Sequence, residues 1–129
     1  MDRRYYGRTR IGVMSNFIIK DNPLGLREFT GTIDNISEGG ILIRVDMDCF
    51  GVAVDSITEG MIIYFQTYDE YELFGQHKED IITGEVEVIR VEHGKDVKLF
   101  GCKMKKLSPE LNQYITNRKL SVYMKTIKE

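Results

Sequence analysis

The chain changes its hydrophobic period once, near residue 107, and this change limits the folds open to it. Before that point, short segments rich in β-branched and aromatic residues alternate with turn sequences, which predicts a series of strands. After it, "LSPELNQYITNRKLSVYMK" places apolar residues at helical spacing, with Ser108 as a favourable N-cap and Pro109 at the first helical position. We therefore expect a sheet followed by one amphipathic helix.

The predicted strands form six segments, most of them joined by hairpin connections. They cover residues 11–20, 28–36, 41–46, 61–69, 82–92 and 97–107. The adjacent Val88 and Ile89 interrupt the alternation of the fifth segment, which predicts a β-bulge or a change of face. Six such strands and a terminal helix predict a mainly β fold, a small six-stranded antiparallel barrel with a C-terminal α-helix.

The length of 129 residues suits a single domain with one core. We expect residues 1–10 to form a flexible basic arm, residues 11–106 the barrel and residues 108–127 the helix. The longest apolar run is five residues, far short of the roughly 20 needed to cross a bilayer, so no membrane insertion is expected. Cys49 and Cys102 lack metal-ligand spacing and indicate two small buried thiols in a reduced, cytoplasmic protein, although one disulfide remains open.

The net charge of −2 conceals a segregation of charge along the chain. Residues 1–10 sum to +3, residues 103–129 sum to +5, and the segment between them carries −10. Basic ends on an acidic body argue against binding of long nucleic acids, and the acidic central strands disfavour a barrel that binds single strands. The pattern instead favours a small anion bound locally.

Two polar motifs point to that anion. Arg4 and Arg8 form R-x-x-x-R, and Asn35, Ser37 and Gly40 form N-x-S-x-x-G. With Asp or Asn allowed at the first position, the second pattern is expected by chance only about 0.05 times at this composition. In this order the motifs resemble the signature of the PilZ domain, a bacterial receptor for cyclic di-GMP. The stretches "EGMIIYF" and "LFGCKMKKLSPELNQYI" resemble further parts of that family, whose six-stranded barrel and C-terminal helix agree with the predicted architecture.

The resemblance implies a cyclic di-GMP site made of Arg3, Arg4, Arg8, Asn35, Ser37, Gly39 and Gly40. Arginine suits this ligand because its planar fork matches guanine O6 and N7 and also phosphate. An asparagine amide can bind base edges, a serine supplies a hydroxyl, and glycines let the backbone approach the ligand. The arginine at position 3 implies that the ligand binds as an intercalated dimer.

Hairpin geometry gives an independent reason for the two motifs to meet. In an antiparallel pair, the start of the first strand and the end of the second lie at the same end of the sheet. Arg4 and Arg8 precede the first predicted strand, and Asn35 to Gly40 close the second. The motif halves are therefore expected to converge.

The implied function is a cyclic di-GMP receptor whose N-terminal arm becomes ordered on binding and which signals to an unidentified downstream protein. Motility, exopolysaccharide secretion and virulence are all outputs open to the family. The alternative is a PilZ-like adaptor that acts by protein contact without ligand. No hydrolase, nucleotide-triphosphatase or zinc-protease motif is present, so we expect no catalysis, and neither a metal nor a cofactor.

The remaining polar and aromatic residues have ordinary structural interpretations. Tyr5 and Tyr6 either pack on the barrel or stack on bases. The lysines of the last strand form a solvated face or help to attract the anion; they are Lys103, Lys105 and Lys106. His77 and His93 are predicted to be isolated surface residues in polar turns, and the acidic pair at 69–70 to lie in a surface loop.

Overall fold

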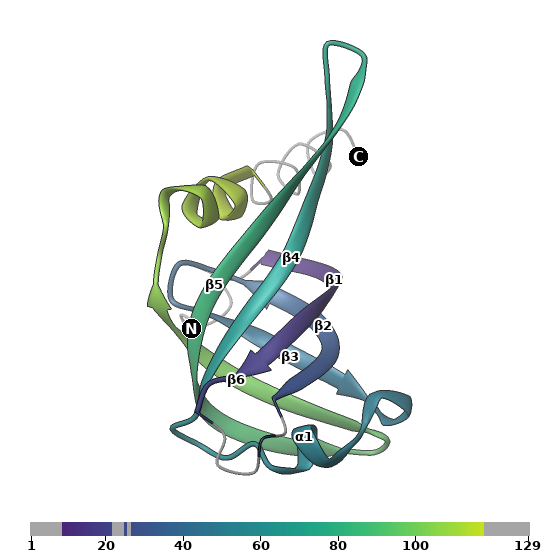
Figure 1. The fold of residues 1–129 in the computed structure, drawn as a ribbon, viewed down its shortest axis with the longest axis vertical. Coiled ribbons are helices and arrows are strands. Elements are labelled where there is room, and N and C mark those ends of the chain that lie inside the picture. The colour runs from purple at the N-terminus through teal and green to yellow at the C-terminus, as the bar shows by residue number, and fades with distance from the viewer. Residues whose placement is uncertain (1–8, 22–24, 26, 118–129) are drawn as a thin grey trace, which may run out of the picture.

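The computed structural model describes residues 9–21, 25 and 27–117, and in it six antiparallel strands close into a barrel (Figure 1). The strand order around the barrel is β1-β2-β3-β6-β5-β4. The strands are β1 (Thr9–Ile19), β2 (Glu28–Ile36), β3 (Gly40–Asp46), β4 (Ile62–Leu73), β5 (Gln76–Gly94) and β6 (Val97–Lys106). The predicted mainly β fold with six antiparallel strands is confirmed.

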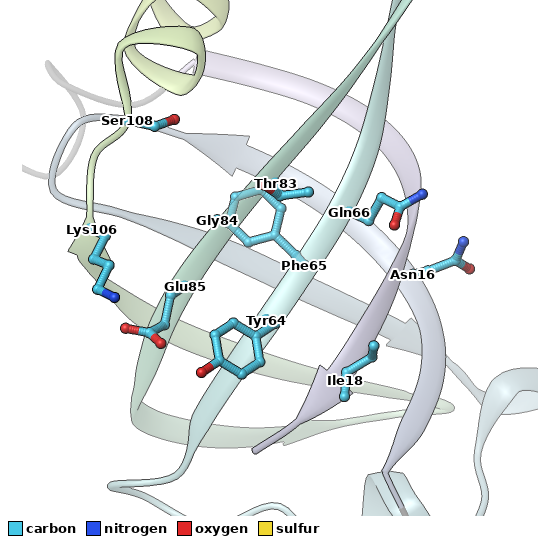
Figure 2. A pocket seen from close by; sticks show the side chains of 10 residues that line it. All are labelled: Asn16, Ile18, Tyr64, Phe65, Gln66, Thr83, Gly84, Glu85, Lys106 and Ser108. Carbon is cyan, nitrogen blue, oxygen red and sulfur yellow. The ribbon is translucent and has the colours of Figure 1, made fainter.

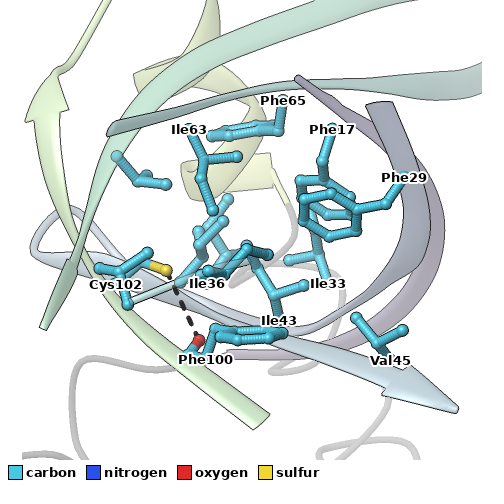
Figure 3. Close-up of a cluster of buried hydrophobic side chains, with 14 of the residues drawn as sticks. Phe17, Phe29, Ile33, Ile36, Ile43, Val45, Ile63, Phe65, Phe100 and Cys102 are labelled. Atoms are coloured by element: carbon cyan, nitrogen blue, oxygen red, sulfur yellow. Dashed lines mark hydrogen bonds between the residues drawn. The ribbon is translucent and has the colours of Figure 1, made fainter. Parts of the chain in front are cut away.

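Inward-facing side chains from all six strands form a single core (Figure 3). Phe17 and Phe29 stack with their ring centroids 4.9 Å apart, and Phe29 also meets Phe100 at 6.5 Å. Ile33 and Ile43, which face each other across β2 and β3, are fully buried. Each such side chain contributes about 1.5–3 kcal/mol on burial, so the alternating pattern of the strands fixes which face points inward.

The chain between β3 and β4 covers one end of the barrel. It contains a 3-10 turn, η2 (Met47–Cys49), and a single helical turn, α1 (Val52–Asp55). Val54 and Ile57 are buried against the core, and the Lys98 ammonium lies 2.6 Å from the Asp55 carboxylate. This stretch, which has no clear period in the sequence, is thus fixed by two apolar anchors and one ion pair.

The C-terminal helix begins at residue 109 and continues through residue 117, the last described position. The Ser108 hydroxyl accepts a hydrogen bond from the Leu111 N–H at 3.1 Å, which confirms the predicted N-cap. Leu111, Tyr114 and Ile115 are buried, so the apolar face of the helix packs on the barrel. Within the described residues, no helix is long and apolar enough to cross a membrane.

Several element boundaries differ from the sequence-based expectations. Thr9 and Arg10, predicted to belong to the arm, already lie in β1 and pair with residues of β2. The strands β4 and β5 continue to a turn at residues 74–75, so the acidic pair at 69–70 lies in a strand, and the predicted loop is wrong. His77 also lies in β5 instead of a turn. Neither cysteine forms a disulfide; Cys102 is buried and Cys49 half-buried.

The predicted irregularity near Val88 is confirmed. The register of β5 with β6 shifts between Val88 and Arg90, so Ile89 is the extra residue of a bulge. Ile89 is exposed while Val88 is buried, which is the change of face that two adjacent apolar residues indicate.

Candidate functional site

The start of β1 and the end of β2 lie side by side, as hairpin geometry predicts. Thr9 pairs with Ile36, and Arg10 pairs with Asn35. The register of β1 with β2 shifts after Arg10, and Gly12 lies in this shift with a φ of +57°. A glycine adopts this backbone conformation without strain. The chain therefore enters the barrel next to the N-x-S-x-x-G segment.

Arg3, Arg4 and Arg8 lie outside the described residues, as do Tyr5 and Tyr6. The four remaining predicted site residues occupy the end of β2 and the turn into β3; they are Asn35, Ser37, Gly39 and Gly40. The structure brings these four together within one β-hairpin connection.

Ser37 organises that connection through its backbone and its side chain. The Ser37 N–H donates to the Gly40 carbonyl at 2.9 Å, and the Gly40 N–H donates back to the Ser37 carbonyl at 3.3 Å. The Ser37 hydroxyl accepts a hydrogen bond from the Gly39 N–H at 3.2 Å. The serine thus forms a compact turn of the kind that short hydroxyl side chains favour.

Asn35 carries an unused acceptor beside this turn. Its Oδ1 atom is buried and has no hydrogen-bond partner among the described residues. A buried acceptor left without a partner costs about 1–3 kcal/mol in desolvation. Asn35 is therefore the described side chain of the motif that is most in need of a partner from elsewhere.

The two glycines differ in their surroundings. Gly40 is buried where β3 passes β6, and its N–H already bonds to Ser37. Gly39 is exposed, and a Cβ atom added there would meet the Ser37 hydroxyl at an ordinary 3.7 Å. Of the two, Gly39 presents the accessible backbone, whereas Gly40 has a packing role.

The end of β6 lies against the same turn and brings lysines to it. Lys103 pairs with Gly40 in the register, and the Met104 N–H donates to the Gly39 carbonyl at 2.8 Å. Lys103 and Lys105 are exposed, and the Lys105 ammonium lies 3.5 Å from the Glu87 carboxylate. The motif end of the barrel therefore has positive charge within the described chain as well as in the sequence of the arm.

A hollow that the sequence does not reveal lies on the outer face of β1, β4 and β5, away from the motif turn (Figure 2). It has a volume of about 480 Å³ and includes the exposed Ile18 and Tyr64, with Lys106 and Ser108 on the side of the helix. We call it the outer groove. None of the described motif residues, Asn35 to Gly40, lines it. The sequence offers only single apolar residues at outward positions of β1 and β4, and the pairing of these two strands brings them together.

Lys20 lies beside the outer groove and interacts with Tyr64. Its ammonium is 5.8 Å from the centroid of the tyrosine ring. The hydrogen bond with Tyr64 is the main cause that raises the pKa of Lys20 above its ordinary value, and nearby negative charge adds to it. Lys20 is therefore a cation at neutral pH.

His77 is not isolated, contrary to the prediction. Glu70 pairs with Glu79 across β4 and β5, and the ligand-type atoms of Glu70, His77 and Glu79 lie within 4.8 Å of one another. All three side chains are exposed. Water solvates such groups fully, and proximity alone does not make them a metal site.

Comparison with known proteins identifies the fold. No protein-family profile and no curated protein matches the sequence. The PilZ domain of YcgR from Escherichia coli with c-di-GMP superposes with a TM-score of 0.62 at 15% identity, covering 99% of this chain and 100% of that one. MotI from Bacillus subtilis, an inhibitor of motility, gives 0.62 at 20% identity, covering 94% of this chain and 53% of that one.

A third structure extends the similarity. PlzA from Borreliella burgdorferi in complex with c-di-GMP gives a TM-score of 0.52 at 10% identity, covering 95% of this chain and 52% of that one. This chain thus spans about half the length of MotI and PlzA and the whole PilZ domain of YcgR. Similarity at these identities establishes the architecture, and the six-stranded barrel with its C-terminal helix has the fold of a PilZ domain.

Proposed function

We propose that this protein is a receptor for cyclic di-GMP, and that its site combines Arg3, Arg4 and Arg8 with Asn35, Ser37 and Gly39. The observation that carries the proposal is the pairing of Thr9 with Ile36, because it delivers the chain from Arg8 directly to the N-x-S-x-x-G turn. The fold, shared with the c-di-GMP-bound YcgR and PlzA structures, supports the same ligand.

The chemistry of the described residues suits a nucleotide with polar base edges. The buried Oδ1 of Asn35 can accept a hydrogen bond from a guanine N–H, which satisfies an atom otherwise left without a partner. The Ser37 turn presents the exposed Gly39 backbone next to it. Arginines from the arm then supply charge-assisted hydrogen bonds to the phosphates and guanines.

Binding in this proposal is a switch without catalysis. The arginines close over the ligand, and ordering the arm costs about 1–2 kcal/mol per residue, which the charge-assisted contacts offset. Gly40 contributes by fixing the turn instead of contacting the ligand. The ordered arm changes the surface at this end of the barrel, and a downstream protein in the cytoplasm recognises the change.

A second ligand molecule fits the charge of the arm. Two stacked molecules of cyclic di-GMP carry four negative charges, and Arg3 adds a third cation to Arg4 and Arg8. We propose an intercalated pair of ligands in each chain.

The alternative function is an adaptor that acts by protein contact without ligand. The similarity to MotI, described as an inhibitor of motility, favours an output of this kind. The two functions differ in one property, since an adaptor of this type gains no thermal stability from cyclic di-GMP.

Isothermal titration of the protein with cyclic di-GMP, combined with thermal unfolding, tests the proposal. The wild type should bind and unfold at a higher temperature with ligand, while Arg4→Ala and Arg8→Ala should bind at least about 100-fold more weakly. Arg27→Ala, at an exposed position just before β2 and at the opposite end of the barrel, is the matched control and should bind normally. Absence of binding by the wild type would favour the adaptor, and unchanged affinity in both arm variants would refute the location of the site.

A further inference from the structure

The tip of the β4–β5 hairpin exposes an aromatic ring in an unfavourable backbone conformation. Phe74 is 96% exposed and has a φ of +51°, and Gly75 follows with a φ of +74°. Two-residue turns with two positive φ values favour Asn-Gly or Asp-Gly, and a phenylalanine in the left-handed region costs about 1–2 kcal/mol. The ring gains almost no burial within the described chain, so packing there does not offset this cost, whereas a contact with another molecule would.

The hairpin that carries Phe74 extends beyond the barrel (Figure 1). Strand β4 pairs with β5 as far as Leu73 and Gln76, whereas the pairing of β1 with β4 ends at Gln66 and that of β6 with β5 ends at Glu85. Among the described strands, residues 67–73 and 76–82 therefore have strand-pairing partners only in each other. A two-stranded ribbon in water is marginally stable by itself, and a contact along it would stabilise it.

The charge of this ribbon defines the surface that it can bind. Residues 67–82 contain five carboxylates and one lysine, a net charge of −4 with His77 neutral. Asp69 pairs with Asp80, and Glu70 pairs with Glu79, so like charges face each other across the strands. Such pairs are destabilising. The complementary surface is an apolar hollow bordered by cations.

The outer groove of the same protein has this character (Figure 2). Its apolar surface includes Ile18 and Tyr64, which are 44% and 37% exposed. Lys106 lines it and Lys20 lies over the Tyr64 ring, while Glu85 is the one carboxylate among its lining residues. The volume of about 480 Å³ is ample for one phenyl ring.

We propose that the hairpin tip of one molecule docks in the outer groove of a second copy of this chain, with Phe74 against Ile18 and Tyr64. Lys20 and Lys106 then face the acidic ribbon that carries the ring. Each copy has both a tip and a groove, so a symmetric dimer makes the contact twice, as isologous interfaces do. The contact requires no nucleotide and does not rest on the proposed ligand.

Sedimentation velocity of the full chain at increasing concentration tests this dimer. The wild type should associate reversibly below about 500 µM, more weakly at high salt because the ribbon and the lysines attract each other. Phe74→Asn should weaken association at least about tenfold and preserve or raise the unfolding temperature, because Asn-Gly is the preferred turn. Met47→Asn removes another exposed apolar side chain, far from the tip and the groove, and should associate like the wild type.

A mixing experiment tests whether the tip meets the groove. Ile18→Glu places a negative charge in the groove and should also prevent self-association. An equimolar mixture of Phe74→Asn and Ile18→Glu should associate more strongly than either variant alone and more weakly than the wild type. One of the two contacts remains in the mixture, because the first variant keeps an intact groove and the second an intact tip. A wild type that stays monomeric to about 500 µM, or a Phe74→Asn variant that associates as well as Met47→Asn, would overturn the proposal. A mixture that associates no more strongly than either variant alone would overturn the pairing of tip with groove.

Discussion

Gly40 lies so close to β6 that a Cβ atom at this position would collide with the backbone carbonyl oxygen of Cys102. The obstacle is backbone, which cannot move aside as the end of a flexible side chain can. The last glycine of the N-x-S-x-x-G motif thus has a structural reason that is independent of any ligand. It lets β3 and β6 approach closely at the end of the barrel where the motif turn lies.

Substitution of Gly40 by alanine should therefore destabilise the fold. Relief of the collision requires β3 to move away from β6, and overpacking of this kind costs about 1–3 kcal/mol. Urea unfolding of Gly40→Ala should show this loss. Gly39→Ala is the matched control, since it has an ordinary contact and no left-handed backbone, and its stability should stay within about 0.5 kcal/mol of the wild type. Equal stabilities would refute the packing role.

Asn35→Ala should separate binding from stability. Removing a buried acceptor that lacks a partner should leave the free energy of unfolding unchanged or raise it by up to about 1 kcal/mol. Affinity for cyclic di-GMP should fall at least about tenfold, because the proposed hydrogen bond to the ligand is lost. Paired unfolding and titration curves measure both. A variant that is less stable and still binds normally would show that Asn35 serves the fold instead.

Arg3→Ala should change the number of ligands bound and not only the affinity. The proposed pair of cyclic di-GMP molecules concentrates four negative charges, and removal of one arginine favours a single bound molecule. Calorimetric stoichiometry should fall from two ligands per chain to one, while Arg4 and Arg8 still hold that ligand. A stoichiometry of one in the wild type would refute the role of Arg3.

Local signals in the sequence explain what could be predicted of the fold. The Ser108 cap, the bulge after Val88 and the first two strands all follow from turn chemistry or hydrophobic period within a few residues. The outer part of the β4–β5 hairpin could not be found in this way. Residues 76–80 are all polar, so they show no alternation, and backbone pairing holds them instead of a buried face.

The candidate site also combines features that local sequence signals predict with features that they do not. The convergence of Thr9 with Ile36 follows from hairpin geometry, which needs only neighbouring strands. The packing of Gly40 against Cys102 depends on the pairing of β3 with β6, two strands far apart in the sequence. The outer groove likewise requires β1 to close on β4. Contacts of this kind are fixed by the closed barrel and by no local pattern.

Lys103 should assist ligand capture from the edge of the site. It is exposed and pairs in register with Gly40 on β3 and with Glu87 on β5, and the Glu87 carboxylate lies 3.5 Å from the Lys105 ammonium. An exposed charge of this kind contributes about 0.5–1 kcal/mol to binding an anion and is screened by salt. Lys103→Gln should therefore weaken cyclic di-GMP binding about two- to fivefold at low salt, and the difference from the wild type should shrink as salt increases.

Lys95→Gln provides the control for this effect, since Lys95 is equally exposed in the β5–β6 turn at the other end of the barrel. Both variants lose one positive charge, so the net charge of the protein changes equally. Only proximity to the Ser37–Gly40 turn distinguishes them. Titrations at two salt concentrations should show a loss of affinity for cyclic di-GMP in Lys103→Gln alone. An equal loss of affinity in both variants would mean that the overall charge of the protein attracts the ligand and that Lys103 has no special position.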